Sequence, residues 1–124
     1  MKGDTIYLGE DCRGKRHFDC IFFVNWVLTT VLQRLIWFAE KDYFEGKKLG
    51  ATILPATHTS LMNADIVVRI DAKGHEHIGF LTAEGNMIHA RYPEAGVQLT
   101  GFVVPQDKHT KICRLSDKFL RIGA

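Results

Sequence analysis

The fold is decided by residues 77–91, which read HIGFLTAEGNMIHAR. Two short runs of alternating or β-branched residues, 77–82 and 86–91, stand on either side of the turn residues Glu84 and Gly85. Runs of this kind, separated by a short turn that contains glycine, are typical of an antiparallel β-hairpin. We therefore expect two neighbouring strands here, joined by a tight loop.

The length of that loop determines which side chains share a face of the hairpin. A two-residue loop would pair Phe80 with His89 and place His77 on the opposite face. A three-residue loop, with Gly85 in the left-handed conformation, pairs Gly79 with His89 and brings both histidines to one face as a diagonal pair. This register separates polar from apolar residues more cleanly, so we favour it. Three apolar side chains then take the other face: Ile78, Phe80 and Ile88.

Further strands are expected on both sides of the hairpin. The runs 65–70 and 97–104 are short and rich in β-branched residues, and turn residues separate both from the hairpin. Residues 111–115 could add a last strand. Residues 46–62 contain glycine, proline and several threonines and serines, and we interpret them as a connection. The pattern predicts an antiparallel sheet of about five strands.

A long helix precedes the strands in the sequence. From Asp19, a plausible N-cap, apolar residues fill nearly every helical face as far as Phe38, and we expect the helix to end near Gly46. A helix that is apolar all round is surrounded by protein. The sequence therefore predicts an α+β fold, with an N-terminal central helix packed on one face of an antiparallel sheet, in a single domain that spans residues 1–124.

Composition and charge exclude several classes of protein. The chain has 124 residues, of which 46% are apolar and 24% charged, so it is neither disordered nor collagen-like. Sixteen basic residues oppose fourteen acidic ones, a net charge of +2 that is too balanced to indicate a nucleic acid as partner. Three cysteines, an odd number, do not form a disulfide framework and leave at least one free thiol.

Membrane and export signals are not apparent. The most apolar stretch, 20–39, is interrupted by Asn25, Gln33 and Arg34, and its uncharged part is shorter than the ~20 residues that a membrane span needs. Residues 1–14 lack the apolar core of a signal peptide. We expect no membrane span and see no signal peptide.

Cys20 is the first candidate for a chemical role. It follows Asp19 in the first turn of the expected helix, where unpaired N–H groups and the positive end of the macrodipole favour a thiolate. A cysteine at a helix start that faces two histidines on a sheet is the arrangement of a papain-like nucleophile, base and orienting group. In that arrangement His77 takes the thiol proton and His89 holds the imidazole of His77 in its working tautomer. The backbone N–H of Cys20 is a natural oxyanion donor. The alternative is that Cys20 is a small buried apolar residue at the start of the helix.

These residues resemble the NlpC-type cell-wall peptidases. Segment 17–24, HFDCIFFV, is similar to that family's nucleophile motif, Phe-Asp-Cys-Ser-Gly-Phe-Val. Segment 64–68, ADIVV, is similar to its Gly-Asp-Leu-Val-Phe strand, and residues 77–90 are similar to its His-Val-Gly-Ile-Tyr strand, turn and Ile-His-Ala strand. The order of these motifs and the spacing of the two histidines both match, and the resemblance covers residues 7–104.

The resemblance implies a papain-like fold and a Cys-His-His triad formed by Cys20, His77 and His89. It also implies hydrolysis of an amide bond in peptidoglycan stem peptides, usually the bond from D-glutamate to the following diamino acid, through a thioester. No metal or organic cofactor is needed for that chemistry. Family members often have a tyrosine before the nucleophile that lines the oxyanion region, and Tyr7 is the candidate here. Asp19, beside the nucleophile, is a second candidate for oxyanion or substrate binding.

The chain departs from the family pattern in ways that leave alternatives open. Ile21 and Phe22 replace the Ser-Gly after the nucleophile, which puts bulk where the helix normally meets substrate, and a substrate-facing arginine is missing. Acyl transfer, in which an amine replaces water on the thioester, is one alternative, and a catalytically degenerate binding module is another. A zinc site made of His75, His77 and His89 is a third alternative. We favour the simpler interpretation that His75 is an exposed residue at the end of a strand.

The expected site of action follows from the family. NlpC-type enzymes act on the cell wall, outside the cytoplasm, and this sequence contains no export signal. Phage lysis, a dedicated secretion system or a leader that is not part of this sequence would have to bring the protein to its substrate.

Overall fold

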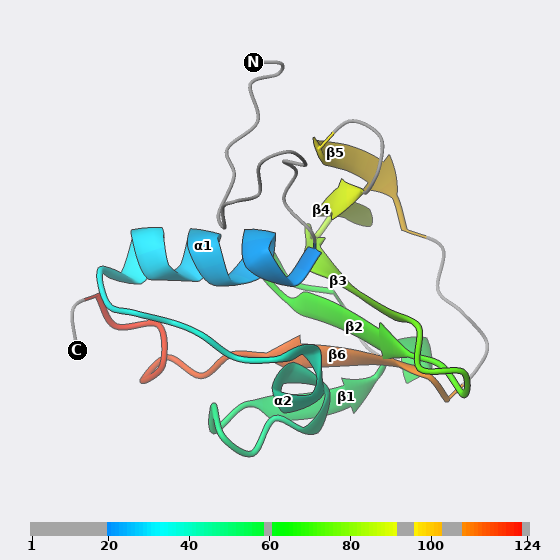
Figure 1. Ribbon diagram of the computed structural model, residues 1–124, viewed down its shortest axis with the longest axis horizontal. Coiled ribbons are helices and arrows are strands. Elements are labelled where there is room, and N and C mark those ends of the chain that lie inside the picture. Colours follow the sequence, from blue (N-terminus) through cyan, green and yellow to red (C-terminus); the bar gives the residue numbers. More distant parts are fainter. Residues whose placement is uncertain (1–19, 59–60, 92–95, 103–107, 123–124) are drawn as a thin grey trace.

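The strands form one antiparallel sheet with both helices on the same face. The computed structural model describes residues 20–58, 61–91, 96–102 and 108–122. Its elements are α1 (Cys20–Leu32), α2 (Glu40–Glu45), β1 (Thr52–Pro55), the short 3-10 helix η1 (Ala56–His58), β2 (Ile66–Ile70), β3 (Glu76–Leu81), β4 (Asn86–Arg91), β5 (Gly96–Gly101) and β6 (Thr110–Arg114). The strand order is β1-β6-β2-β3-β4-β5. Figure 1 shows α1 beside the β3–β4 side of the sheet and α2 beside β1 and β6.

The predicted α+β class and the antiparallel sheet are confirmed, but the strand count is six rather than about five. The additional strand, β1, lies within residues 46–62, which we interpreted as a connection. β1 pairs only with β6 and therefore forms an edge of the sheet, where Pro55 is tolerated because no second neighbour needs its missing N–H. Ile53 packs against the core under the helices and Leu54 against the opposite face, as strand alternation requires.

The prediction of one helix from Asp19 to near Gly46 is wrong. Helix α1 ends at Leu32, Gln33 adopts a positive φ of 59°, and the chain runs back along α1 before α2 begins at Glu40. The end of α2 was predicted correctly, since Gly46 caps it with a φ of 77°. α1 is also not enclosed all round, because Val31 in its last turn is 55% exposed.

Two polar side chains on α1, the buried Asn25 and the half-buried Thr29, account for the break in the helix. The Asn25 amide donates to the Phe38 carbonyl at 2.8 Å, and its oxygen accepts the Phe38 N–H and, at 2.5 Å, the hydroxyl of the buried Tyr43. The Thr29 hydroxyl accepts the Ile36 N–H at 2.9 Å. These bonds satisfy the backbone of the returning segment, which a continuous helix would have satisfied by itself. Burial raises the pKa of the Tyr43 hydroxyl far above its ordinary value.

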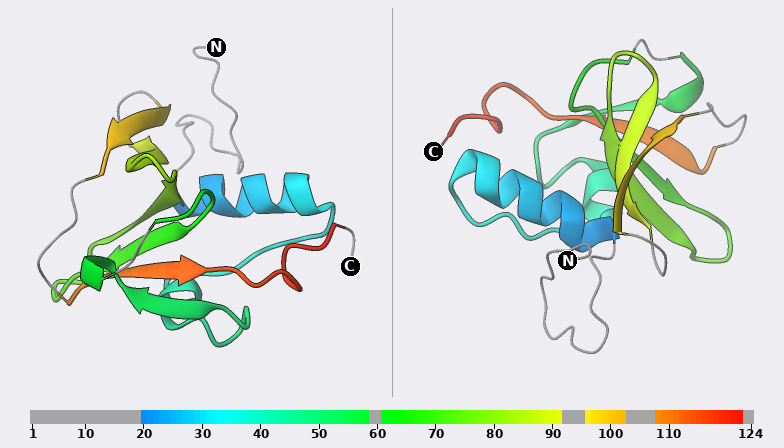
Figure 2. Two further views of the ribbon diagram at one scale, coloured as in Figure 1. Left: turned by 180° about the vertical axis from the view of Figure 1, so that it is seen from behind. Right: turned by 90° about the horizontal axis from the view of Figure 1, so that it is seen from above.

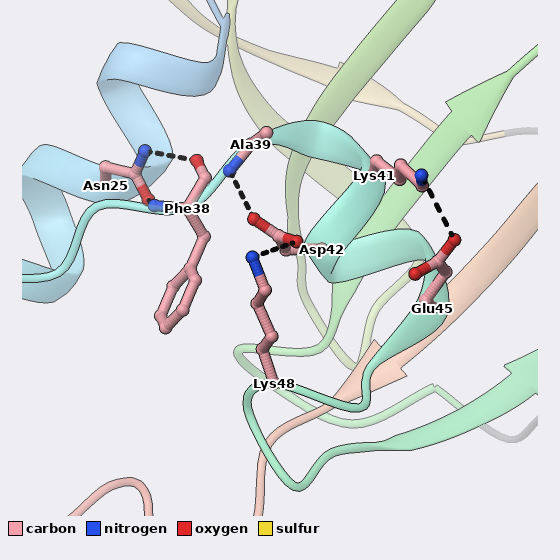
Figure 3. A network of polar contacts seen from close by, with 7 residues as sticks. All are labelled: Asn25, Phe38, Ala39, Lys41, Asp42, Glu45 and Lys48. Atoms are coloured by element: carbon pink, nitrogen blue, oxygen red, sulfur yellow. Dashed lines mark hydrogen bonds and ion pairs between the residues drawn. The ribbon is translucent and has the colours of Figure 1, made fainter.

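Figure 3 shows how this segment leads into α2. Asn25 points from α1 to Phe38, and the next residue, Ala39, donates its N–H to the Asp42 carboxylate at 3.0 Å. This bond satisfies one of the unpaired N–H groups at the start of α2. Lys48 also pairs with Asp42, at 3.3 Å. At the end of α2 the Gly46 N–H donates to the Asp42 carbonyl at 2.8 Å, so the short helix is held at both its start and its end by local polar contacts.

The sheet buries apolar residues on both faces. We call the larger group the helix-side core, because it unites residues of α1 and α2 with side chains from β2, β3, β4 and β6; its fully buried members from the sheet are Ile66, Val68, Ile78 and Cys113. The far-side cluster lies on the other face and comprises Ala56, Val67, Leu81, Met87 and Ile112. Among the described residues, no helix is both long enough and apolar enough to cross a membrane.

Replacing Asn25 by alanine should destabilise the protein. The Tyr43 hydroxyl and the Phe38 backbone would lose buried partners, so we expect the free energy of unfolding to fall by about 2–4 kcal/mol. Urea unfolding followed by circular dichroism measures this change. Thr30→Ala, on the exposed side of the same helix, is the control and should change the free energy by less than about 0.5 kcal/mol. Equal effects of the two substitutions would contradict the role given to Asn25.

The stability should also fall at alkaline pH because of Cys113. Burial, assisted by the Asp65 carboxylate, raises the pKa of the Cys113 thiol to about 12. The unfolded thiol ionises near pH 8.5 while the native thiol stays protonated, so the folded state loses relative stability as the pH rises above that value. We expect the free energy of unfolding to fall by up to about 1.4 kcal/mol per pH unit between pH 9 and 10. In Cys113→Ala, urea unfolding should show a smaller fall of the free energy of unfolding with pH in this range. An unchanged pH dependence in that variant would show that another group causes the fall.

Candidate functional site

The β3–β4 hairpin has the register that its sequence predicts. Leu81 pairs with Met87 and Phe80 with Ile88, as the three-residue loop requires. Gly85 has a φ of 89° and closes the loop by donating its N–H to a carbonyl at 3.0 Å. Glycine adopts this left-handed conformation without the steric cost that a side chain would impose. The predicted register is therefore confirmed.

This register brings His77 and His89 together. His77 Nε2 lies 2.7 Å from His89 Nδ1, and the two rings are nearly perpendicular, with their centroids 4.9 Å apart. His89 Nε2 in turn lies 2.9 Å from the hydroxyl of Thr100 on β5. His89 is 6% exposed and His77 is half-buried. A chain of polar contacts thus runs across three adjacent strands.

The contacts of His89 define a consistent set of tautomers. If Nε2 of His89 donates to the Thr100 hydroxyl, Nδ1 of His89 accepts from Nε2–H of His77. The basic nitrogen of neutral His77 is then Nδ1, on the side of the ring away from His89. This is the relation between a general base and the group that orients it.

Gly79 makes room for the histidine pair. A Cβ atom at this position would lie 2.8 Å from His89 Cβ and 2.9 Å from the Ile88 carbonyl oxygen, closer than such atoms approach in proteins. Beyond this point β3 and β4 separate: their paired ladder ends at Phe80 and Ile88, whereas β4 stays paired with β5 as far as Arg91. The two imidazoles therefore meet where the strands part.

The structure places Cys20 at the first residue of α1. Its side chain is half-buried and packs against the helix-side core, and the first turn of α1 carries no acidic residue that would offset the positive end of the helix dipole. α1 contacts both β3 and β4. Figures 1 and 2 show its blue N-terminal end next to these upper strands.

The direction of α1 along the sheet shows which end of β3 lies near Cys20. The ring of Phe23 packs edge-on against Phe80 at 5.9 Å, and the last turn of α1 borders Leu81 at the end of β3. The start of α1 therefore points toward the beginning of β3, where His77 lies. Strand alternation, however, places both imidazoles on the face opposite to the one that α1 covers. A thiol on α1 can meet His77 only past the end of the paired β3–β4 ladder.

The residues that depart from the family motif have a structural role. Ile21 and Phe22 are half-buried against the helix-side core, and the ring of Phe22 also contacts that of Trp37 in a tilted arrangement, with centroids 5.3 Å apart. Their bulk contributes to packing of α1. Tyr7 and Asp19, the other two predicted site residues, lie outside the described residues.

Other predicted ligands are not gathered into a metal centre. His75 lies before β3, is exposed, and contacts Asp71 at 3.3 Å, as its interpretation as a strand-end residue requires. Within residues 20–58, 61–91, 96–102 and 108–122, no group of three His, Cys, Asp or Glu side chains is close enough to hold a metal ion. Thr100 is the site residue that sequence analysis missed. The signal was the register of β5, which pairs Gln98 with His89 and so brings Thr100 beside the same imidazole.

No known family model and no curated protein matches the chain.

Replacing Gly79 by alanine should disrupt the histidine pair. The added methyl would push against His89 Cβ and the Ile88 carbonyl, so we expect a loss of about 1–3 kcal/mol in the free energy of unfolding. The imidazole nitrogen signals of His77 and His89 in NMR spectra should shift as their hydrogen bond lengthens. Gly101→Ala is the matched control, because nothing lies within 4 Å of a Cβ there. Unchanged imidazole signals in Gly79→Ala would contradict the role of this glycine.

Proposed function

We propose that this protein is a papain-like cysteine hydrolase that cleaves an amide bond in peptidoglycan stem peptides. The observation that carries the proposal is the 2.7 Å contact between His77 Nε2 and His89 Nδ1, in a chain whose only other described thiol, Cys113, is fully buried. Cys20 at the start of α1 supplies the nucleophile. The motif resemblance supplies the substrate class and the bond, from D-glutamate to the following diamino acid.

The proposed reaction divides the work among three side chains. Nδ1 of His77 removes the thiol proton, and Cys20 Sγ attacks the carbonyl carbon of the amide bond. The same imidazole then protonates the leaving amine, which leaves a thioester on Cys20 that water hydrolyses. His89 holds the orientation and tautomer of His77, and Thr100 does the same for His89.

A second candidate function, a non-catalytic binding module, is favoured by one observation. α1 covers the face of β3 opposite to the imidazoles, which restricts the route by which the thiol reaches His77. In such a module Cys20 would be a core residue without enhanced reactivity. The pH dependence of alkylation separates the two candidates: a catalytic Cys20 reacts with iodoacetamide below pH 8 with a titration near neutrality, and a core cysteine reacts slowly throughout.

The direct test is digestion of purified peptidoglycan, followed by mass spectrometry of the released fragments. Cys20→Ala should abolish the fragments, and His77→Gln should slow their release by about 10²–10⁴-fold, because it removes the general base. Thr100→Val should shift the pH profile with a smaller loss, since it acts through His89. His75→Gln, an exposed histidine outside the pair, is the control and should match the unmodified protein.

The masses of the fragments identify the bond that is cut. Fragments that persist in Cys20→Ala would overturn the assignment of the nucleophile. Absence of fragments from several wall types, together with a Cys20 that iodoacetamide does not modify, would overturn the hydrolase proposal and leave the binding module.

A further inference from the structure

An apolar groove runs beside α1, away from the histidine pair. Its walls are the side of α1 from Phe23 to Leu32, the end of the β3–β4 hairpin and Leu120, and its volume is about 510 Å³. Figures 1 and 2 show the red C-terminal segment next to the cyan end of α1. Leu120, which belongs to this segment, lines the groove. A volume of this size is typical of sites for small ligands, which are of the order of 300–1,000 Å³.

The described lining offers a ligand almost no polar contact. Its two polar residues, Asn63 and Thr82, are uncharged, and both side chains are used within the fold. The Asn63 oxygen accepts the Ala83 N–H at 2.7 Å, and the Thr82 hydroxyl accepts the Asn86 N–H at 3.1 Å. The groove therefore favours the hydrocarbon part of a ligand, since its described lining offers a polar group few hydrogen bonds in place of those to water.

A basic hollow borders the same C-terminal segment as the groove. Its described lining holds four basic side chains, Arg34, Lys48, Lys118 and Arg121, and no acidic one, around a volume of about 440 Å³. The two sites lie on either side of the C-terminal segment, because Leu120 lines the groove while its neighbours in the chain, Phe119 and Arg121, line the hollow.

Arg34 holds this junction in place. Its guanidinium donates to the Arg121 carbonyl at 2.7 Å and to the Phe119 carbonyl at 2.5 Å, and it lies over the Phe119 ring. The C-terminal segment between the apolar groove and the basic hollow is therefore held in place before any ligand binds, which lowers the entropic cost of binding.

We propose that the groove and the hollow together bind a single-chain anionic amphiphile, a long-chain fatty carboxylate. The alkyl chain lies along α1 from Val31 toward Phe23, and the carboxylate faces Lys118 and Arg121. The charge of the hollow selects an anionic head group and the lining of the groove selects the chain. This site needs no catalysis and does not depend on the hydrolase proposal.

The test is a titration with sodium dodecanoate below its micelle concentration, followed by NMR of the methyl groups of Val27, Val31 and Leu120. The titration uses the Cys20→Ala protein, so that a reaction at the Cys20 thiol cannot contribute to the result. The three methyl signals should shift with saturation. Affinity should rise with chain length from octanoate to dodecanoate, by up to about fourfold per methylene. Dodecanol, which lacks the charge, should bind about tenfold more weakly.

Two variants with the same chemical change serve as test and control. Val31→Asp puts a carboxylate on the wall of the groove and should weaken dodecanoate binding at least tenfold, whereas Leu35→Asp, at an 80% exposed residue outside the lining, should not. Lys118→Gln should weaken binding of dodecanoate but not of dodecanol.

Three results would overturn the proposal. Equal loss in Val31→Asp and Leu35→Asp would indicate unspecific adsorption to exposed apolar side chains. Absence of shifts at the three methyl groups would show that the groove does not take an alkyl chain. Binding to phosphatidylglycerol vesicles without binding of free dodecanoate would indicate a membrane-docking surface in place of a ligand site. None of these results bears on peptidoglycan digestion, so the two proposals fail independently.

Discussion

The register of the β3–β4 hairpin is the constraint on which both the core and the candidate site depend. A slip of one residue would turn Ile78 and Phe80 out of the helix-side core and bury the imidazole of His77 beneath α1. The positive φ of Gly85 sets the loop length, and the missing side chain of Gly79 lets His89 approach β3. Two glycines thus determine where two histidines meet.

A buried amide has a comparable role on the helical side of the molecule. Asn25 binds the backbone at Phe38 and the hydroxyl of Tyr43, which turns the chain back after Leu32 and separates α1 from α2. The turn has a consequence for the surface. Because α1 stops there, its last turn stays exposed at Val31, and the groove beside it remains open. The polar contact that ends the helix therefore also shapes the proposed ligand site.

The two proposed sites use different parts of α1 and different physics. At its start, the positive end of the helix dipole favours a thiolate at Cys20, and the imidazole pair lies toward the same end of β3. Along its side and at its end, apolar side chains and a basic hollow favour a ligand with a long chain and an anionic head. A chemical modification of one site should leave the other unchanged, because no described side chain lines the groove and also belongs to the histidine pair.

The sequence by itself determined the local features of this protein. Alternation and turn residues predicted five of the six strands, the loop of the hairpin and the shared face of His77 and His89, because each depends on residues that are near in the chain. The break at Gln33, strand β1, the contact between His89 and Thr100, and the groove were decided only by the tertiary structure. Each of these depends on a pairing that no local pattern specifies: Asn25 with Phe38 and Tyr43, β1 with β6, the register of β4 with β5, and α1 with Leu120. An apolar run looks the same whether it continues as a helix or folds back, and only the buried partner of a polar side chain distinguishes the two.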